Sequence, residues 1–148
     1  MTDAEVALDG TNIQSVVPLY MSVFNDPPWN DGWTAEAAAE RLHAFAAFPR
    51  FHGIAIFRSE AAIAFALGWG ERWTTGWHFH LKEMCVAAGQ QDQQIGSRLL
   101  ASVETRLAAA GFEGIYLQTG GNVPARGFYE AKGFRDLRLV SLSKRLAT

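Results

Sequence analysis

Apolar and polar residues alternate along the first part of the chain in a pattern that predicts a short strand followed by two helices. The strand lies near Glu5 to Leu8. From Ile13 to Phe24 apolar residues recur every three or four positions, which predicts a helix in which Pro18 would be a kinking interior residue. Thr34 is the expected N-cap of the second helix, which runs to about Phe48.

The middle of the chain has the pattern of three strands. Phe51 to Phe57 and Ala61 to Gly70 are expected to form a hairpin around residues 58–60, and Trp77 to Val86 is the next expected strand. Strict alternation along this third strand puts one set of side chains on a common face, namely Phe79, Leu81, Glu83 and Cys85. A carboxylate therefore interrupts an otherwise apolar strand face.

The last part of the chain has the pattern of strand and helix in turn. An amphipathic helix is expected from Ile95 to about Ala110, followed by a buried strand over Ile115 to Gln118. A short helix begins near Pro124, and a last strand is expected over Phe134 to Leu142. The order β-α-α-β-β-β-α-β-α-β predicts a mixed sheet with helices on both faces, and the length predicts one domain over residues 1–148.

Composition narrows the classes of partner. Hydrophobic residues make up 49% of the chain and charged residues 19%, which is typical of a globular protein. A formal net charge of -2 gives no basic surface for nucleic acid or an anionic membrane. The lone Cys85 excludes an intramolecular disulfide, and the first ten residues lack the pattern of a secretory signal. We therefore expect a cytoplasmic protein that binds neither nucleic acid nor membrane.

The turn that precedes the helix at Ile95 is a candidate anion site. A strand that turns directly into a helix leaves the first helical N–H groups without partners at the positive end of the helix dipole. Gly96 lets a ligand approach the backbone closely, and the amides from about Gln91 to Ser97 would converge on a phosphate. Every strand-to-helix junction has such amides, and water or a side chain commonly satisfies them, so this pattern alone leaves both interpretations open.

Two longer stretches resemble the signatures of one enzyme family. The sequence LKEMCVAAGQQDQQIGSRLL resembles the acetyl-CoA-binding motif of the GNAT superfamily of N-acetyltransferases, in which a strand, a glycine-containing loop and a helix follow one another. Downstream, NVPARGFYEAKGF is similar to the second signature of that family. The two signatures occur in the family's order and the element order matches over nearly the whole chain. The resemblance implies an α+β fold with a mostly antiparallel central sheet.

The resemblance also implies acetyl-CoA as co-substrate and assigns residues to it. Met84 and Val86 would hydrogen-bond the pantetheine arm through their main chains, and Asn122 would lie beside the pantetheine or the thioester. Tyr129 would stand near the sulfur as general acid. The backbone amides implied for the pyrophosphate belong to Gln91, Gln93, Gln94, Ile95, Gly96 and Ser97.

Two residues depart from the family's loop pattern. Gln94 stands where the first glycine is expected, and Asp92 adds a negative charge where basic residues are common. Both departures are consistent with weaker CoA binding or with a shifted loop.

Glu83 is the candidate general base. Acetyl transfer to an amine needs a neutral amine, a polarised thioester carbonyl and a proton for the departing thiolate. A carboxylate on an apolar strand face is expected to have a raised pKa, which suits a base that acts directly or through water. Two structural alternatives remain open: Glu83 pairs with an arginine across the sheet, or a bulge rotates it outward.

The loop FNDPPWNDGW is the candidate acceptor site. Its tryptophans would face a cation and its carboxylates would attract one, the residues being Asp26, Trp29, Asp31 and Trp33. Alternatively the tryptophans fix the loop to the core and the carboxylates are solvated. His78 and His80 share a strand face, but no third ligand follows at a fixed spacing, so we expect no metal.

The sequence therefore predicts an N-acetyltransferase that moves an acetyl group from acetyl-CoA to a primary amine by direct transfer in a ternary complex. The acceptor, a small molecule or a peptide amine, is not determined. A non-catalytic CoA-binding regulatory module on the same fold is the alternative. The resemblance also allows a homodimer, which no sequence feature establishes.

Overall fold

The computed structural model describes residues 2–90 and 94–147. Its internal contacts divide the chain into two compact units, Met1–Leu117 and Gln118–Thr148. The two units are described separately below.

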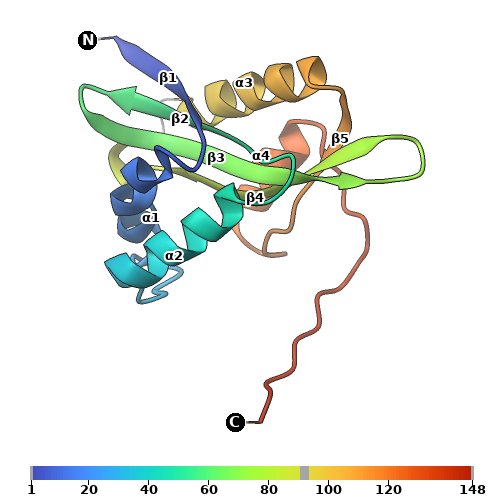
Figure 1. Cartoon of the computed structure of the whole chain (residues 1–148). Coiled ribbons are helices and arrows are strands. Elements are labelled where there is room, and N and C mark those ends of the chain that lie inside the picture. The colour runs from blue at the N-terminus through green and yellow to red at the C-terminus, as the bar shows by residue number, and fades with distance from the viewer. Residues whose placement is uncertain (1, 91–93, 148) are drawn as a thin grey trace. The chain divides into compact units, whose positions relative to one another are not determined.

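The N-terminal unit is built on a five-stranded sheet in the order β1-β2-β3-β4-β5 (Figure 1). Neighbouring strands are antiparallel from β1 to β4, and β5 pairs with β4 in parallel. The prediction of a mixed, mostly antiparallel sheet is confirmed. The strand bounds are β1 Asp3–Leu8, β2 His52–Arg58, β3 Ala61–Arg72, β4 Trp77–Val86 and β5 Phe112–Tyr116.

Two helices cover one face of this sheet. A single 3-10 turn, η1 (Ile13–Val16), leads into α1 (Val17–Phe24), so Pro18 lies in the first turn of α1, where its missing N–H removes no helical bond. The predicted continuous helix with a kink at Pro18 is wrong for this reason. In α2 (Ala35–Ala46) the predicted cap is confirmed, because Thr34 Oγ1 accepts a hydrogen bond of 3.1 Å from the amide of Ala37.

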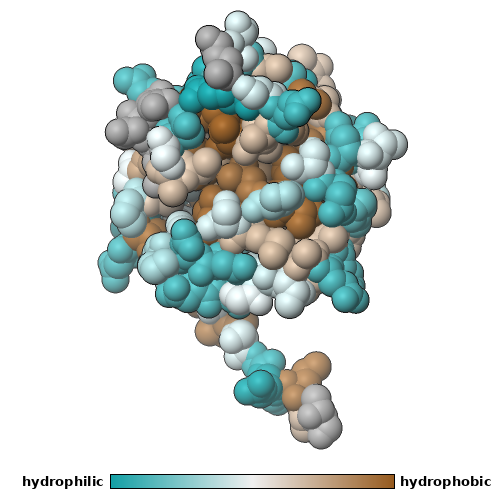
Figure 2. Space-filling view, turned by 90° about the vertical axis from the view of Figure 1, so that its left-hand side faces the viewer, coloured by the Kyte–Doolittle hydropathy of each residue, from teal (hydrophilic) through white to brown (hydrophobic). Residues whose placement is uncertain are grey.

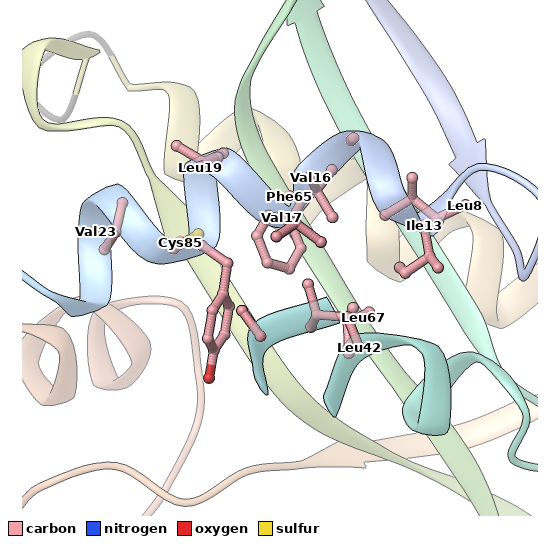
Figure 3. Close-up of a cluster of buried hydrophobic side chains, with 13 residues drawn as sticks. Leu8, Ile13, Val16, Val17, Leu19, Val23, Leu42, Phe65, Leu67 and Cys85 are labelled. Carbon is pink, nitrogen blue, oxygen red and sulfur yellow. The ribbon is translucent and has the colours of Figure 1, made fainter. Parts of the chain in front are cut away.

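The core lies between these helices and the sheet. Figure 3 shows Val16, Val17 and Leu42 close to Phe65, which is fully buried in β3. The opposite face of the sheet is covered by α3 (Ile95–Ala109), whose buried side chains are Ile95, Leu99, Leu100, Val103 and Leu107. Helices on both faces, as predicted, are therefore confirmed for this unit.

A β-bulge in β4 overturns the predicted common face of Phe79, Leu81, Glu83 and Cys85. Leu67 pairs with Glu83 whereas the next residue, Gly68, pairs with Leu81, so Lys82 is an extra residue in β4. Before the bulge, Leu81 faces α3; after it, Glu83 faces α1 and α2. Gly68 permits the close approach, because a Cβ there would lie 1.8 Å from the carbonyl oxygen of His80.

The C-terminal unit contains one helix, α4 (Pro124–Ala131), which begins at the predicted proline. The strand predicted over Phe134 to Leu142 is wrong, since no strand occurs among residues 118–147 of the structure. Figure 1 draws the segment after α4 as an extended trace. A strand exists only when its N–H and C=O groups pair with a neighbour, and an apolar pattern does not supply that neighbour.

Among the described residues, no helix is long and apolar enough to cross a membrane.

Candidate active site

Glu83 lies on the sheet face that α1 and α2 cover. It comes directly after the bulge in β4, and only 11% of its side chain is exposed. Arg41 of α2 is its ionic partner, with Nε 3.5 Å from Glu83 Oε2. The arginine suggested by the sequence is thus present, but it comes from a helix instead of a neighbouring strand.

The guanidinium of Arg41 is held between aromatic rings as well as beside the carboxylate. Its Cζ lies 4.7 Å from the ring centroid of Phe45 and 5.3 Å from that of Trp33. Tyr20 of α1 packs edge-on against Trp33 at 5.4 Å. Glu83, Arg41, Trp33, Phe45 and Tyr20, here called the Glu83 cluster, therefore join α1, α2, β4 and the loop before α2.

The Glu83 cluster shifts the protonation equilibria of its members. Burial raises the pKa of Glu83, and Tyr20, Arg41 and Lys82 offset part of that rise. Burial, with the nearby charge of Glu83, raises the pKa of Tyr20 above its ordinary value of 10. The direction of this shift suits the general base that the sequence predicts at Glu83.

An aromatic surface continues from this cluster along the sheet. Trp69 stacks on Phe48 at 4.2 Å and meets His80 edge-on at 5.3 Å. His80 in turn stacks on Tyr116 at 4.6 Å, and the Tyr116 hydroxyl donates a 2.5 Å hydrogen bond to Glu71. Aromatic faces ending in a carboxylate form a surface suited to a cationic ligand.

The predicted acceptor residues are placed in different surroundings. Trp33 reaches the Glu83 cluster, and its indole N–H donates to Asp31 Oδ2 at 3.1 Å. Trp29 packs edge-on against Phe24 and stays 47% exposed. The carbonyl of Asp26 accepts from the amides of Trp29 and Asn30. Trp33 therefore contacts Arg41, the ion-pair partner of Glu83, and Asp31 contacts Trp33, whereas Trp29 and Asp26 shape the loop.

The strand that carries Met84 and Val86 runs beyond its pairing with β5. The β4–β5 ladder ends at His80 and Tyr116, whereas the β3–β4 ladder continues to Ala64 and Val86. Main-chain groups on the far side of this segment face away from the β3 ladder. That is the kind of edge along which an extended pantetheine arm can hydrogen-bond.

The start of α3 has a backbone geometry that explains the glycine of the family pattern. Gln94 is the N-cap of α3 and adopts φ 58° and ψ 21°, the left-handed region that favours glycine. Ile95 is buried, while Gly96 and Ser97 are half-buried at the first turn. Gln91 and Gln93, also predicted to bind the pyrophosphate, lie outside the described residues, as does Asp92.

Hydrogen bonds between side chains hold Gln90, the residue before the undescribed segment 91–93, in place. Arg58 donates to both carboxylate oxygens of Asp3 and to Gln90 Oε1 at 2.7 Å, and Arg98 of α3 donates to Asp3 Oδ2 at 2.8 Å. These hydrogen bonds hold the pKa of Asp3 well below its usual range. The residue before the undescribed segment is thus tied to β1 and β2.

Asn122 and Tyr129 belong to the C-terminal unit. Asn122 is exposed in the turn before α4. Tyr129 is half-buried in α4, with its ring 5.3 Å from that of Phe128 and 5.5 Å from that of Phe134.

The surroundings of Cys85 and His78 favour structural roles for these two side chains. Burial raises the pKa of the Cys85 thiol, which keeps it protonated and a poor nucleophile. His78 lies 3.6 Å from Glu113, and the described part of the chain contains no cluster of three or more His, Cys, Asp or Glu residues that could hold a metal.

Comparison with known proteins agrees with the sequence signatures. The model of the acetyltransferase (GNAT) family matches residues 14–134. The match spans most of the chain, so the protein belongs to this family and is an acetyl-CoA-dependent N-acetyltransferase.

Solved structures show the same fold at low sequence identity. An integron cassette protein from the mobile metagenome of V. cholerae has a TM-score of 0.81 at 14% identity, covering 99% of this chain and 94% of that chain. An aminoglycoside acetyltransferase from an uncultured soil metagenomic sample, in complex with sisomicin, has a TM-score of 0.77 at 14% identity, covering 98% and 97%. The aminoglycoside N-acetyltransferase AAC(6')-Iy in complex with CoA has a TM-score of 0.77 at 14% identity, covering 98% and 96%.

Sequence reasoning missed Tyr20 and Arg41 as neighbours of the candidate base. Tyr20 fits the apolar spacing of Ile13 to Phe24, which indicates packing and gives no sign of a polar role. A signal for Arg41 exists, because it lies three residues after the buried Ala38 and four before Phe45, on the stripe that faces the sheet. A charged residue on a buried stripe needs a partner, and Glu83 was the unpaired carboxylate.

Proposed function

We propose that this protein acetylates a small molecule that carries several amino groups, by direct transfer in a ternary complex with acetyl-CoA. The observation that carries the proposal is Glu83, a buried carboxylate with a raised pKa beside an aromatic surface on the α2 side of the sheet. Aminoglycoside acetyltransferases share the fold, which supports an amino sugar as the acceptor to test first.

Charge supports a cationic acceptor. Residues 1–117 contain seven basic and thirteen acidic side chains, a formal net charge of -6, although the whole chain carries only -2. Glu71 and Glu83 are among them, together with Asp26 and Asp31 of the loop. A field of this sign raises the local concentration of a multiply charged amine.

Each chemical step of the proposal is assigned to a named group. Glu83, directly or through water, takes the proton from the acceptor ammonium, and the free amine then attacks the thioester carbonyl. Main-chain donors of β4, at Met84 or Val86, polarise that carbonyl as its oxygen gains negative charge. Tyr129 gives a proton to the departing thiolate and is reprotonated by the proton that the attacking nitrogen loses as the amide forms. The products are an amide and free CoA.

Cofactor binding is assigned to the loop and the first turn of α3. The amides of Gln91, Gln93 and Gln94 and those of Ile95, Gly96 and Ser97 would hold the pyrophosphate, with Asn122 beside the pantetheine arm. Acetyl-CoA supplies the activated acetyl group. The family match runs from residue 14 to residue 134 and so crosses from one unit to the other, which supports a single catalytic domain. A cytoplasmic location and a homodimer remain part of the proposal.

Two measurements test the proposal in order. Acetyl-CoA at a hundred times its dissociation constant should stabilise the fold by about 2.7 kcal/mol, which thermal unfolding detects. Release of free CoA thiol should then depend on an amine from a panel of aminoglycosides, polyamines and peptides. Binding without thiol release from any amine would favour the regulatory module, and no binding would exclude both.

A further inference from the structure

A cavity of about 340 Å³, here called the α3 cavity, lies between α3 and the sheet. Figure 1 shows α3 across one face of the sheet and α1 and α2 on the other, which is the face of Glu83. Among the described residues, none of those assigned to acetyl-CoA, to catalysis or to the acceptor lines this cavity. It is therefore separate from the site proposed for acetyl transfer.

Small side chains on the sheet leave this space open. Ala7, Ile54 and Ala66 lie side by side across β1, β2 and β3, so two of these three positions carry only a methyl group. Two residues further along β3, on the same face, Gly68 pairs with His52. The sheet thus offers few large side chains to fill the gap beneath the C-terminal half of α3.

The inner wall of the α3 cavity is apolar and uncharged. It includes fully buried side chains such as Ile54 and Phe79. Among the described residues that line it, the only polar side chain besides Arg106 is His52. Burial, together with the charge of Arg50, lowers the pKa of His52, so its imidazole is neutral at pH 7. Such a wall favours the apolar part of a ligand, which gains by leaving water.

Arg106 supplies a cation at the mouth of the α3 cavity. It is one of three exposed lining residues, the others being Ala7 and Ala109. Its guanidinium lies 3.8 Å from Glu5, and because these side chains are 45% and 35% exposed, the pair contributes little to stability. Ser102 donates a 2.6 Å hydrogen bond to the same carboxylate. Glu5 therefore keeps a partner when Arg106 turns to another anion.

Enclosure distinguishes the α3 cavity from other apolar surface. In the extended C-terminal segment Leu139 is 80% exposed and Leu142 90%, and Figure 2 shows hydrophobic and hydrophilic residues side by side along it. Side chains surrounded by water in this way do not enclose a small ligand. The α3 cavity, in contrast, is lined by residues of four strands, β1 to β4, and of α3.

We propose that the α3 cavity binds a medium-chain alkyl carboxylate, with its chain between α3 and the sheet and its carboxylate on Arg106. A dry apolar cavity of about 150 Å³ holds a benzene molecule, so a cavity about twice as large holds a chain of roughly eight carbon atoms. The cation at the mouth selects the charged head, and the neutral wall selects the chain. This inference does not depend on acetyl transfer, because the cavity contains none of the described groups assigned to it.

Calorimetry with octanoate, on the full chain without acetyl-CoA or an amine, tests the proposal. Octanoate should bind, and acetate, which has the head without the chain, should not bind at the same concentration. Arg106→Gln should raise the dissociation constant of octanoate about tenfold or more, because it removes the charged donor. Arg98→Gln is the matched control, since Arg98 is an α3 arginine that is 46% exposed and does not line the cavity. No binding of octanoate, or equal weakening in the two variants, would overturn the proposal.

Filling the cavity provides a second test. Ala66→Leu enlarges a side chain of the inner wall, so octanoate binding should be lost while thermal unfolding shows that the variant is folded. A folded variant that binds octanoate as tightly as the wild type would contradict the proposed position.

The position of the bound chain can also be measured on the wild type, without any variant. Nuclear Overhauser contacts should connect the methylene protons of octanoate with methyl groups that line the cavity, namely those of Ile54, Val103 and Leu107. Contacts only with methyl groups on the other face of the sheet, such as those of Val17 and Leu42, would place the ligand elsewhere and exclude the α3 cavity as its site.

Discussion

Arg41 Nε lies 3.5 Å from Glu83 Oε2, yet neither of these buried atoms has a hydrogen-bond partner among the described residues. A buried charged group without a hydrogen bond is costly, and such groups concentrate at functional sites. Arg41 and Tyr20 both favour the charged form of this buried carboxylate and so oppose the rise in its pKa that burial causes.

Replacing Glu83 tests its proposed role as the general base. For Glu83→Gln we expect turnover to fall by about 10² to 10⁴. Because burial raises the pKa of Glu83 above 4.5, the wild-type kcat/KM should rise with pH through a midpoint above that value as the carboxylate ionises. The same shift means that ionisation of Glu83 lowers the free energy of unfolding over this pH range. The acidic limb should be absent from Glu83→Gln. A variant with the wild-type pH profile would exclude Glu83 as the base.

We expect Arg41 to lower the pKa of Glu83 without contacting the substrate. Arg41→Met keeps most of the apolar packing but removes the only cation that Glu83 contacts as an ion pair in the described structure. The pKa of Glu83 should rise further, so the acidic limb of kcat/KM should move to higher pH. The free energy of unfolding should fall by about 1 to 3 kcal/mol, less than for a fully buried pair because the arginine is partly exposed. Stability loss with an unshifted limb would leave Arg41 a purely structural role.

Tyr129→Phe should separate catalysis from binding. If Tyr129 protonates the thiolate, turnover should drop by roughly 10² or more while acetyl-CoA affinity, measured by calorimetry, stays nearly constant. Thr105→Ala is the control, because it removes a hydroxyl that donates to the carbonyl of Ala101 within α3. Wild-type turnover in Tyr129→Phe would remove the acid role.

Gln94→Gly should relieve backbone strain at the start of α3. A left-handed conformation costs a non-glycine residue roughly 1 to 2 kcal/mol, and the added freedom of glycine in the unfolded chain offsets part of the gain. We expect a net stabilisation of about 1 kcal/mol or less, detected as a higher midpoint of thermal unfolding. Gln94→Ala, which keeps the strain, should show no such rise. Equal midpoints for the glycine and alanine variants would contradict the strain argument.

Helices and paired strands were predictable because their signals are local. Thr34 marks the start of α2, and the apolar spacing from Ile95 marks α3. The bulge at Lys82 was not predictable from alternation, since the pattern continues on both sides of the extra residue. The residue that accommodates the bulge lies in the neighbouring strand β3. Gly68 has no Cβ there and so leaves room for the carbonyl of His80.

The site was predictable where chemistry requires a residue type and not where packing chooses the partner. An acidic side chain in an apolar strand indicated Glu83, but Arg41 is distant in sequence and meets it only through the packing of α2. The prediction of a last strand over Phe134 to Leu142 was wrong for a related reason. The apolar pattern of Leu139 and Leu142 predicts burial, but the surface that would bury them is not in the pattern itself.

Initial rates with acetyl-CoA and an amine varied together test the central claim most directly. Direct transfer in a ternary complex predicts that free CoA thiol appears only when the amine is present, with intersecting double-reciprocal lines and no mass gain on the protein from acetyl-CoA alone. Parallel lines with an acetylated protein, or no thiol release with any amine, would contradict it.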